Sequence, residues 1–287
     1  MRTFSKNKIK GALYGIAIGD AMGATTEFMS QLTIKTQYKK RTDIIGKGWL
    51  NLLPGEVTDP TEMAFCVCAA LEKVSNPKSY AQMQKLLDRC CTNLVAWYDS
   101  YPIDMEECCR DVISHCRDLS YKEWILFSQN PHNFNNSNLF GCVPLILCRQ
   151  NLECVLLQSR LTHNNTVCDN AVRRYRELLL ACLKETQLTT QVFPSLPPRF
   201  RHIDHTIDSA LYHLETTATF ETAILEAVYH GGDTNAIAAL TGSLAGALYG
   251  YENIPERWSA QLQPAVREKL DHYAEILSGS PQNAIAS

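Results

Sequence analysis

Apolar residues recur every three to four positions along most of this chain, and long alternation of apolar and polar residues is absent. That period places apolar side chains on one face of an α-helix. It predicts helices over 8–23, 59–74, 79–98, 104–118, 142–158, 166–184, two stretches within 204–229, 236–250 and the segment after 254. The interval 30–54 is expected to be a surface loop. We therefore expect an all-α fold.

Two of these helices carry stripes of small residues at every fourth position. The stripes are Gly11, Gly15, Gly19 and Gly23 in the first helix, and Ala238, Gly242, Gly246 and Gly250 in the later one. A glycine inside a helix costs about 0.5–1 kcal/mol relative to alanine, so a row of them indicates a contact that offsets the cost. The two helices are predicted to cross in contact.

Two helix starts carry polar residues. Asp59 is expected to cap the helix that begins there, with Pro60 in its first turn and Glu62 completing a capping box. This structural role accounts for those residues without any catalytic function. The second start follows Gly231 and Gly232 and presents residues 233–235, whose side chains all carry oxygen.

Length and charge limit the classes of function. The 287 residues contain 27 basic and 30 acidic side chains, a net charge of -3 that gives no reason to expect a nucleic-acid partner. No run of 18 apolar residues predicts a membrane span, and Asp20 interrupts the apolar N-terminal stretch, so no signal peptide is expected. We expect one domain over 1–277, a disordered tail over 278–287 and a cytoplasmic location.

The twelve cysteines lie within apolar helical patterns, and no Cys-x-x-Cys pair is present. Buried, reduced thiols are the ordinary interpretation of that pattern. A structural zinc site built from cysteines is not expected, whereas a reactive thiol stays open.

Several blocks together resemble the ADP-ribosylglycohydrolase family, in the order and spacing of that family. The blocks are residues 11–23 with Glu27, then Thr58-Asp59, 161–163, 231–234, and Ile254-Pro255 with Trp258. The resemblance extends from residue 8 to about 262 and implies a single-domain orthogonal helical bundle with a cleft between helix N-termini. It also implies action on ADP-ribose attached to a protein side chain.

The resemblance implies a magnesium site as well. In the family, two magnesium ions lie between two helix starts, and a glutamate on a loop closes the site; hard divalent cations prefer such oxygen ligands. Thr58, Asp59 and Asp233 match the metal-binding positions, and Glu27 matches the gating glutamate. The implied catalytic residues are therefore Glu27, Asp59 and Asp233.

Three metal-binding positions depart from the family pattern. Pro60 and Asn235 replace aspartates, and Ala236 replaces a threonine. Asn235 keeps a neutral carbonyl oxygen, whereas proline and alanine side chains offer no ligand atom. Three carboxylates cannot neutralise two divalent cations. We expect magnesium to be weakly bound or absent, at most as one ion held by Thr58, Asp59, Asp233 and Asn235.

The substrate side of the cleft departs too. Residues 136–144 align with a family loop that approaches the ribose and phosphates, but Ser137, Phe140 and Gly141 differ from it. The residues expected to contact ADP-ribose are Asn138, Leu139, Phe140, His163, Gly231 and Gly232. A buried aromatic and a capped histidine are the alternative interpretations of Phe140 and His163.

Two functions remain open from the sequence. The first is an ADP-ribosylglycohydrolase-like enzyme with altered or weakened hydrolysis. The second is a catalytically inactive pseudo-hydrolase that binds ADP-ribose, a nucleotide or a protein partner. The replaced ligands favour the second, and the retained carboxylates favour the first, because a helix cap alone would accept serine or asparagine.

Overall fold

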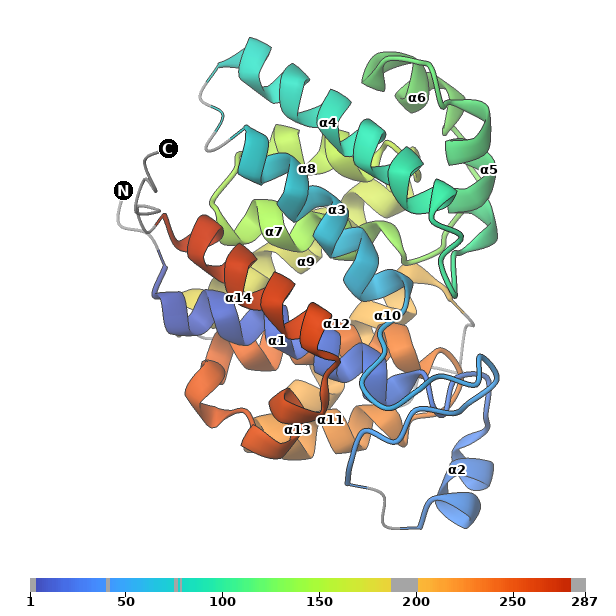
Figure 1. Ribbon diagram of the computed structural model, residues 1–287, viewed down its shortest axis with the longest axis vertical. Helices are drawn as coiled ribbons and strands as arrows, with labels where there is room; N and C mark the ends of the chain where they lie inside the picture. Colours follow the sequence, from blue (N-terminus) through green and yellow to red (C-terminus); the bar gives the residue numbers. More distant parts are fainter. Residues whose placement is uncertain (1–3, 40–41, 75–76, 78, 187–200, 280–287) are drawn as a thin grey trace.

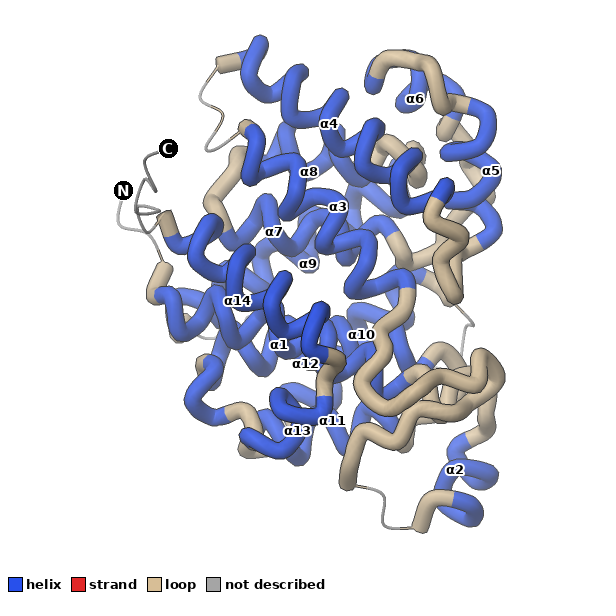
Figure 2. Tube along the Cα trace, viewed as in Figure 1, coloured by secondary structure: helices blue, strands red, loops and turns tan. Residues whose placement is uncertain are grey.

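The regular elements of the chain are helical throughout the part that the structure, a computed structural model, describes: residues 4–39, 42–74, 77, 79–186 and 201–279. Figures 1 and 2 show helices joined by loops, without a β-strand in this part. The elements are α1 (Lys6–Gly23), α2 (Gln31–Gln37), α3 (Asp59–Lys73), α4 (Tyr80–Asp99), α5 (Glu107–His115), α6 (Tyr121–Phe127), α7 (Asn138–Leu147), α8 (Leu152–Ser159), α9 (Thr166–Lys184), α10 (Ile203–Glu215), α11 (Phe220–Val228), α12 (Thr234–Tyr249), a 3-10 turn η1 (Tyr251–Asn253), α13 (Glu256–Gln261) and α14 (Pro264–Ser278). The all-α prediction is confirmed.

The α1–α12 contact is the centre of the fold, as the glycine stripes predict. A methyl group on Gly15 would overlap the carbonyl of Gly242, and one on Gly19 would overlap the carbonyl of Ala238. The antiparallel seam continues to Gly23, which lies against the backbone of Thr234. Because the C-terminus of α1 meets the N-terminus of α12, the residues that follow Gly23 lie beside those that precede Thr234.

The remaining helices pack around this pair. Helices α10, α11 and α9 contact α12, and α14 contacts α1 (Figure 1). Helix α3 packs between α7 and α4 and contacts α1 and α12 as well. The buried side chains form one hydrophobic cluster to which α1, α3, α7, α9 and α12 all contribute, and this cluster fixes the direction in which each helix N-terminus points.

Two sequence expectations about the elements were wrong. The interval 30–54 is not entirely loop, since Ser30 caps the helix α2 by accepting a hydrogen bond from the backbone of Thr33. The single helix expected over 142–158 is two helices, α7 and α8, because the chain turns through Arg149 at φ 60°. Short apolar runs on both sides of Arg149 made the two helices look like one in the sequence.

Three further expectations concern the whole chain. All twelve cysteines are reduced thiols, ten of them buried, as predicted. None of the helices in the described ranges combines the length and apolar character that a membrane crossing requires. Of the predicted tail 278–287, Ser278 ends α14 and Gly279 is its C-cap residue, and 280–287 lies outside the described residues, as does most of the exit loop expected at 186–201.

Candidate active site

A buried carboxylate, Asp20 of α1, positions the start of α3. It accepts hydrogen bonds from the backbone and hydroxyl of Thr58, at 2.8 and 2.5 Å, and from the hydroxyl of Thr61 at 2.5 Å. Burial raises the pKa of Asp20 to about 6, although these hydrogen bonds act to lower it. Asp20 therefore satisfies the N-terminal donors of α3 from a neighbouring helix.

This arrangement corrects the expected capping box. Thr58, not Asp59, is the N-cap residue, and its side chain makes no capping bond. Glu62 accepts a hydrogen bond from Trp97 Nε1 at 2.6 Å instead of closing a box. The side chain of Asp59 is thus not used as a helix cap and lines the adjacent pocket.

A narrow pocket lies between the N-termini of α3 and α12. Its lining combines acidic, amide and apolar side chains with one arginine. The lining residues are Asp59, Pro60, Glu106, Asn136, Ser137, Phe140, Arg201, Asp233, Asn235 and Ala236. Four of the residues expected at the site, Asp59, Phe140, Asp233 and Asn235, therefore lie together here, and Glu106, Asn136 and Arg201 are additions to that set.

Burial raises the pKa of three carboxylates at or beside this pocket. Burial, and then the negative charge of Asp233, raise the pKa of Glu27 to about 8. Burial raises the pKa of Asp233 to about 6, against a hydrogen bond of 2.6 Å from Asn136 Nδ2. The pKa of Asp59 is raised well above its usual value by burial and by the charge of Asp104. We call Glu27, Asp59 and Asp233 the carboxylate cluster.

Arg201 supplies positive charge to the carboxylate cluster. Its guanidinium lies 3.4 Å from Glu27 Oε1 and 4.0 Å from Asp233 Oδ1. Although burial acts to lower it, the pKa of Arg201 is raised, because Asp233, Glu27 and Asp59 surround it with negative charge. A positive charge therefore lies beside two residues of the carboxylate cluster.

A pair of magnesium ions does not fit these residues. Pro60 and Ala236 line the pocket where the resemblance requires ligands. Thr58 Oγ1 donates to Asp20, and Asn235 Oδ1 accepts from the backbone of Ala236 at 2.8 Å, so both oxygens are engaged in local contacts. With Arg201 already among the carboxylates, two further dications would meet too few oxygen ligands.

Gly231 and Gly232 connect the Glu27 loop to α12. Both have positive φ, 88° and 76°, and the carbonyl of Gly232 accepts a hydrogen bond from the backbone of Phe28. Phe28 directly follows Glu27, whose Oε2 accepts a hydrogen bond of 2.7 Å from Trp49 Nε1. The two glycines therefore fix the position of Glu27, and their expected contact with ADP-ribose stays a prediction.

The other residues expected to contact substrate lie in different surroundings. Phe140 lines the pocket. Asn138 donates to Ser159 Oγ at 2.7 Å, and Leu139 is fully buried in the hydrophobic core. All three belong to α7, whereas the sequence placed them in a loop leading into it. Neither Asn138 nor Leu139 is part of the pocket lining in the described part of the chain.

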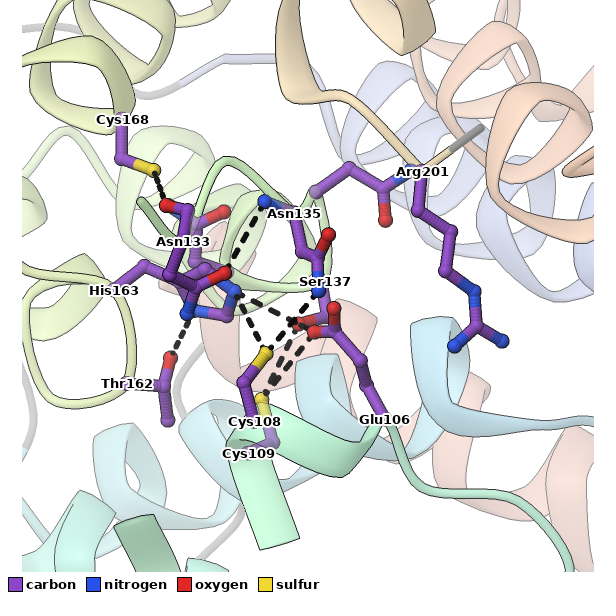
Figure 3. A network of polar contacts seen from close by, with 12 residues as sticks. Glu106, Cys108, Cys109, Asn133, Asn135, Ser137, Thr162, His163, Cys168 and Arg201 are labelled. Atoms are coloured by element: carbon purple, nitrogen blue, oxygen red, sulfur yellow. Dashed lines mark hydrogen bonds and ion pairs between the residues drawn. The ribbon is translucent and has the colours of Figure 1, made fainter. Parts of the chain in front are cut away.

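His163 belongs to a second polar cluster, formed with Glu106 and Cys108 (Figure 3). His163 Nε2 lies 3.6 Å from Cys108 Sγ and 3.4 Å from Glu106 Oε2. We call these three residues the sulfur cluster. Sequence analysis missed it because Cys108 and His163 are 55 positions apart and match no metal-binding spacing. The adjacent cysteines beside an acidic residue were the only local signal.

Hydrogen bonds and opposite charges set the pKa values of the sulfur cluster. A hydrogen bond with Cys109 is the largest cause that lowers the pKa of Cys108, to about 6, against the effect of burial. Burial acts to raise the pKa of Glu106, but His163 lowers it to about 2. Burial acts to lower the pKa of His163, but Cys108 and Glu106 raise it to about 10.

The helical fold and the pocket between the starts of α3 and α12 match one family of known proteins. The sequence model of the family described as ADP-ribosylglycohydrolase matches residues 1–190 and 167–285. This chain belongs to the ADP-ribosylglycohydrolase family.

Particular relatives extend over nearly the whole chain. The ADP-ribosyl-(dinitrogen reductase) glycohydrolase of Rhodospirillum rubrum is 30% identical, over 93% of this chain and 94% of that protein. The ADP-ribosylarginine hydrolase Tri1 of Serratia proteamaculans (strain 568) is 29% identical, over 95% of this chain and 79% of that protein. A solved structure titled ADP-ribosylglycohydrolase-related protein complex shares the fold, with a TM-score of 0.77, 23% identity, and coverage of 95% of this chain and 97% of that one.

Proposed function

We propose that this chain binds ADP-ribose attached to a protein side chain and hydrolyses that bond slowly, without a pair of magnesium ions. The observation that carries the proposal is the position of Arg201, whose guanidinium lies beside Glu27 and Asp233 next to two helix starts. Relatives named as hydrolases of ADP-ribosyl groups, at 30% and 29% identity, support the substrate class.

The pocket suits an anionic ligand with an apolar ring. The N-termini of α3 and α12 both face it, and helix N-termini favour phosphate oxygens. Arg201 can bind a phosphate through two parallel N–H groups, which a lysine could not do. Phe140 forms an apolar wall of the pocket. In this proposal the diphosphate draws the guanidinium away from the carboxylates when it binds.

Each residue of the carboxylate cluster has its own role in the proposed hydrolysis. Asp233, oriented by Asn136, takes the proton from the water that attacks the anomeric carbon. Glu27, which keeps its proton at higher pH, donates it to the departing side-chain nitrogen or oxygen. Asp59, in its ionised form, stabilises the positive charge that develops on the ribose ring. We assign these three roles as part of the proposal.

Release of ADP-ribose from an ADP-ribosylated arginine or serine peptide tests this function. Chelator-treated wild type should release ADP-ribose slowly, and Asp233→Asn should reduce the rate by about 100-fold or more, as loss of a general base does. Asp99→Asn is the matched control, because Asp99 pairs with Arg117 and is 47% exposed. Release that requires magnesium and vanishes with chelator would refute the metal-independent route.

A second candidate is a pseudo-hydrolase that binds ADP-ribosylated proteins without cleaving them. The contact of Arg201 with Glu27 favours it, because a guanidinium stabilises the ionised carboxylate and so opposes the protonated form that would act as the acid. Calorimetric binding of ADP-ribose together with no release in the peptide assay would establish this alternative and refute the enzyme.

A further inference from the structure

The sulfur cluster brings three side chains from separate parts of the chain to one point (Figure 3). Glu106 directly precedes α5, Cys108 lies in its first turn, and His163 follows α8. One ligand atom from each residue lies within 4.8 Å of the other two. Glu106 also lines the pocket at the carboxylate cluster, so the two clusters are neighbours that share a wall.

Two of the three separations between these atoms match the edges of a zinc tetrahedron, and the third is within 4.8 Å. With zinc–sulfur near 2.3 Å and zinc–nitrogen or zinc–oxygen near 2.0–2.1 Å, tetrahedral geometry places sulfur about 3.6 Å from nitrogen, and nitrogen about 3.4 Å from oxygen. Here Cys108 Sγ lies 3.6 Å and Glu106 Oε2 lies 3.4 Å from His163 Nε2. The same imidazole nitrogen faces both partners, as it must if one ion joins them.

A direct hydrogen bond explains the carboxylate contact less well. A charge-assisted N–H to carboxylate bond normally spans about 2.7–2.9 Å, well short of the 3.4 Å between His163 and Glu106. Glu106 Oε2 also accepts a hydrogen bond from Ser137 Oγ, whereas the other carboxylate oxygen, Glu106 Oε1, has no hydrogen-bond partner among the described residues, although the side chain is only 3% exposed. A buried carboxylate oxygen without a partner is costly, and a metal or its bound water would satisfy it.

The groups around the cluster suit a metal site as well. Thr162 Oγ1 lies 2.9 Å from His163 Nδ1, which fixes the ring and leaves Nε2 directed at the other two residues. Asn135 Nδ2 donates to Cys108 Sγ at 3.4 Å. Cys108 is partly exposed, whereas Glu106 and His163 are buried.

We propose that Glu106, Cys108 and His163 bind one zinc ion and leave its fourth coordination position open. A thiolate, a carboxylate and a neutral imidazole together carry the two negative charges that balance Zn²⁺ in a buried site. The sulfur ligand favours zinc over magnesium, which takes oxygen ligands. Three protein ligands leave room for an exchangeable water or substrate group, as in zinc enzymes. This site does not depend on the function proposed above.

Zinc titration of chelator-treated protein, in competition with a chromophoric chelator, tests the site. Wild type should bind one equivalent of zinc, and Cys108→Ser should bind it at least about 100-fold more weakly, since loss of a group that only hydrogen-bonds to a ligand already costs about 10–100-fold. Cys148→Ser is the matched control, as Cys148 is the other partly exposed cysteine. Zinc binding that survives Cys108→Ser but is lost in Asp233→Asn would place the ion in the carboxylate cluster and overturn the proposal.

Cobalt substitution on unaltered wild type removes any dependence on how the variants fold. Co²⁺ should give the intense sulfur-to-metal charge-transfer absorption of a thiolate ligand, and the spectrum should show tetrahedral coordination. Absence of that absorption at one equivalent of Co²⁺ would overturn the proposal. So would wild type that binds no zinc and instead shows rapid alkylation of Cys108, the behaviour of a thiolate–imidazolium pair without metal.

Discussion

The carboxylate cluster and the sulfur cluster are neighbours that are both largely buried, yet their ionisable groups are shifted in opposite senses. In the carboxylate cluster, burial raises the pKa of Glu27 to about 8 and that of Asp233 to about 6, so neutral forms are favoured. In the sulfur cluster, the pKa of Glu106 falls to about 2 and that of His163 rises to about 10, so charged forms are favoured.

The pKa shifts of the two clusters differ because their neighbouring charges differ, since both clusters are largely buried. In the carboxylate cluster, in addition to burial, the negative charge of Asp233 raises the pKa of Glu27, and that of Glu27 raises the pKa of Asp59. Arg201 contacts Glu27 and Asp233 as a cation. The sulfur cluster alternates a carboxylate, an imidazole and a thiol, so each charge faces an opposite one. Burial is therefore costly in the first cluster and compensated in the second.

The largest expected effect is on stability, through the contact of α1 with α12 that positions the carboxylate cluster. Gly19→Ala places a methyl group on the carbonyl of Ala238 and must move α12, so it should lower the free energy of unfolding by about 3 kcal/mol. Gly141→Ala, which meets only the flexible end of Gln158, should cost less than about 1 kcal/mol. Urea denaturation measures both. Equal losses would show that the α1–α12 seam is not the rigid centre of the fold.

Restoring the family's metal ligands should make the carboxylate cluster bind magnesium more tightly. The triple variant Pro60→Asp, Asn235→Asp and Ala236→Thr adds two carboxylates and a hydroxyl, so magnesium should stabilise it against heat. Magnesium at 100 times its Kd would add about 2.7 kcal/mol, and wild type should gain much less. Thermal scans with and without magnesium measure this. A large shift for wild type that Asp233→Ala abolishes would contradict our account of the cluster.

The pH dependence of stability should change when Glu27 cannot ionise. The folded pKa of Glu27, about 8, exceeds its ordinary value of 4.5, so the folded state retains a proton that the unfolded chain releases. Its contribution to stability is therefore lost as pH rises from about 4.5 to about 8. Glu27→Gln should be more stable than wild type at pH 9, by on the order of 2 kcal/mol, with a smaller difference at pH 5.

Denaturant midpoints at both pH values check the Glu27 prediction. The exposed Glu226→Gln is the control and should change neither midpoint. If Glu27→Gln changed the free energy of unfolding by the same amount at pH 5 and pH 9, ionisation of Glu27 would not be the cause of the pH dependence.

The smallest expected effect lies beside the sulfur cluster. Thr162→Val removes the hydroxyl that orients His163, which should lower the free energy of unfolding by about 1 kcal/mol and zinc affinity by about 10-fold. Zinc competition and denaturation on the same sample report both. Unchanged zinc affinity would mean that the hydroxyl does not position the imidazole for metal.

Local periodicity was enough to predict the centre of the fold. Glycines at every fourth position carry a cost in any helix, so their repetition indicated a helix contact before any partner was known, and the overlap of Gly15 with Gly242 confirms it. Asp59 and Asp233 were also placed together, because each begins or precedes a helix within a recognised motif.

Features that depend on the three-dimensional arrangement were not predictable. Asp20 replaces the expected cap of α3 from another helix, which no spacing near residue 59 indicates. Arg201 follows a proline-containing stretch without any motif and still reaches Glu27, 174 positions away. The sulfur cluster joins the start of α5 to the segment after α8, where Cys108 and His163 are 55 positions apart.

Calorimetric titration of ADP-ribose into metal-free protein tests the central claim most directly, namely that the pocket between α3 and α12 recognises ADP-ribose through Arg201 and not through magnesium. We predict binding with a Kd below about 1 mM, or more than about 4 kcal/mol, that weakens at least about 10-fold in Arg201→Ala and is unchanged in Asp99→Asn. No binding at millimolar ADP-ribose, or binding that appears only with magnesium and is unaffected by Arg201→Ala, would contradict the account.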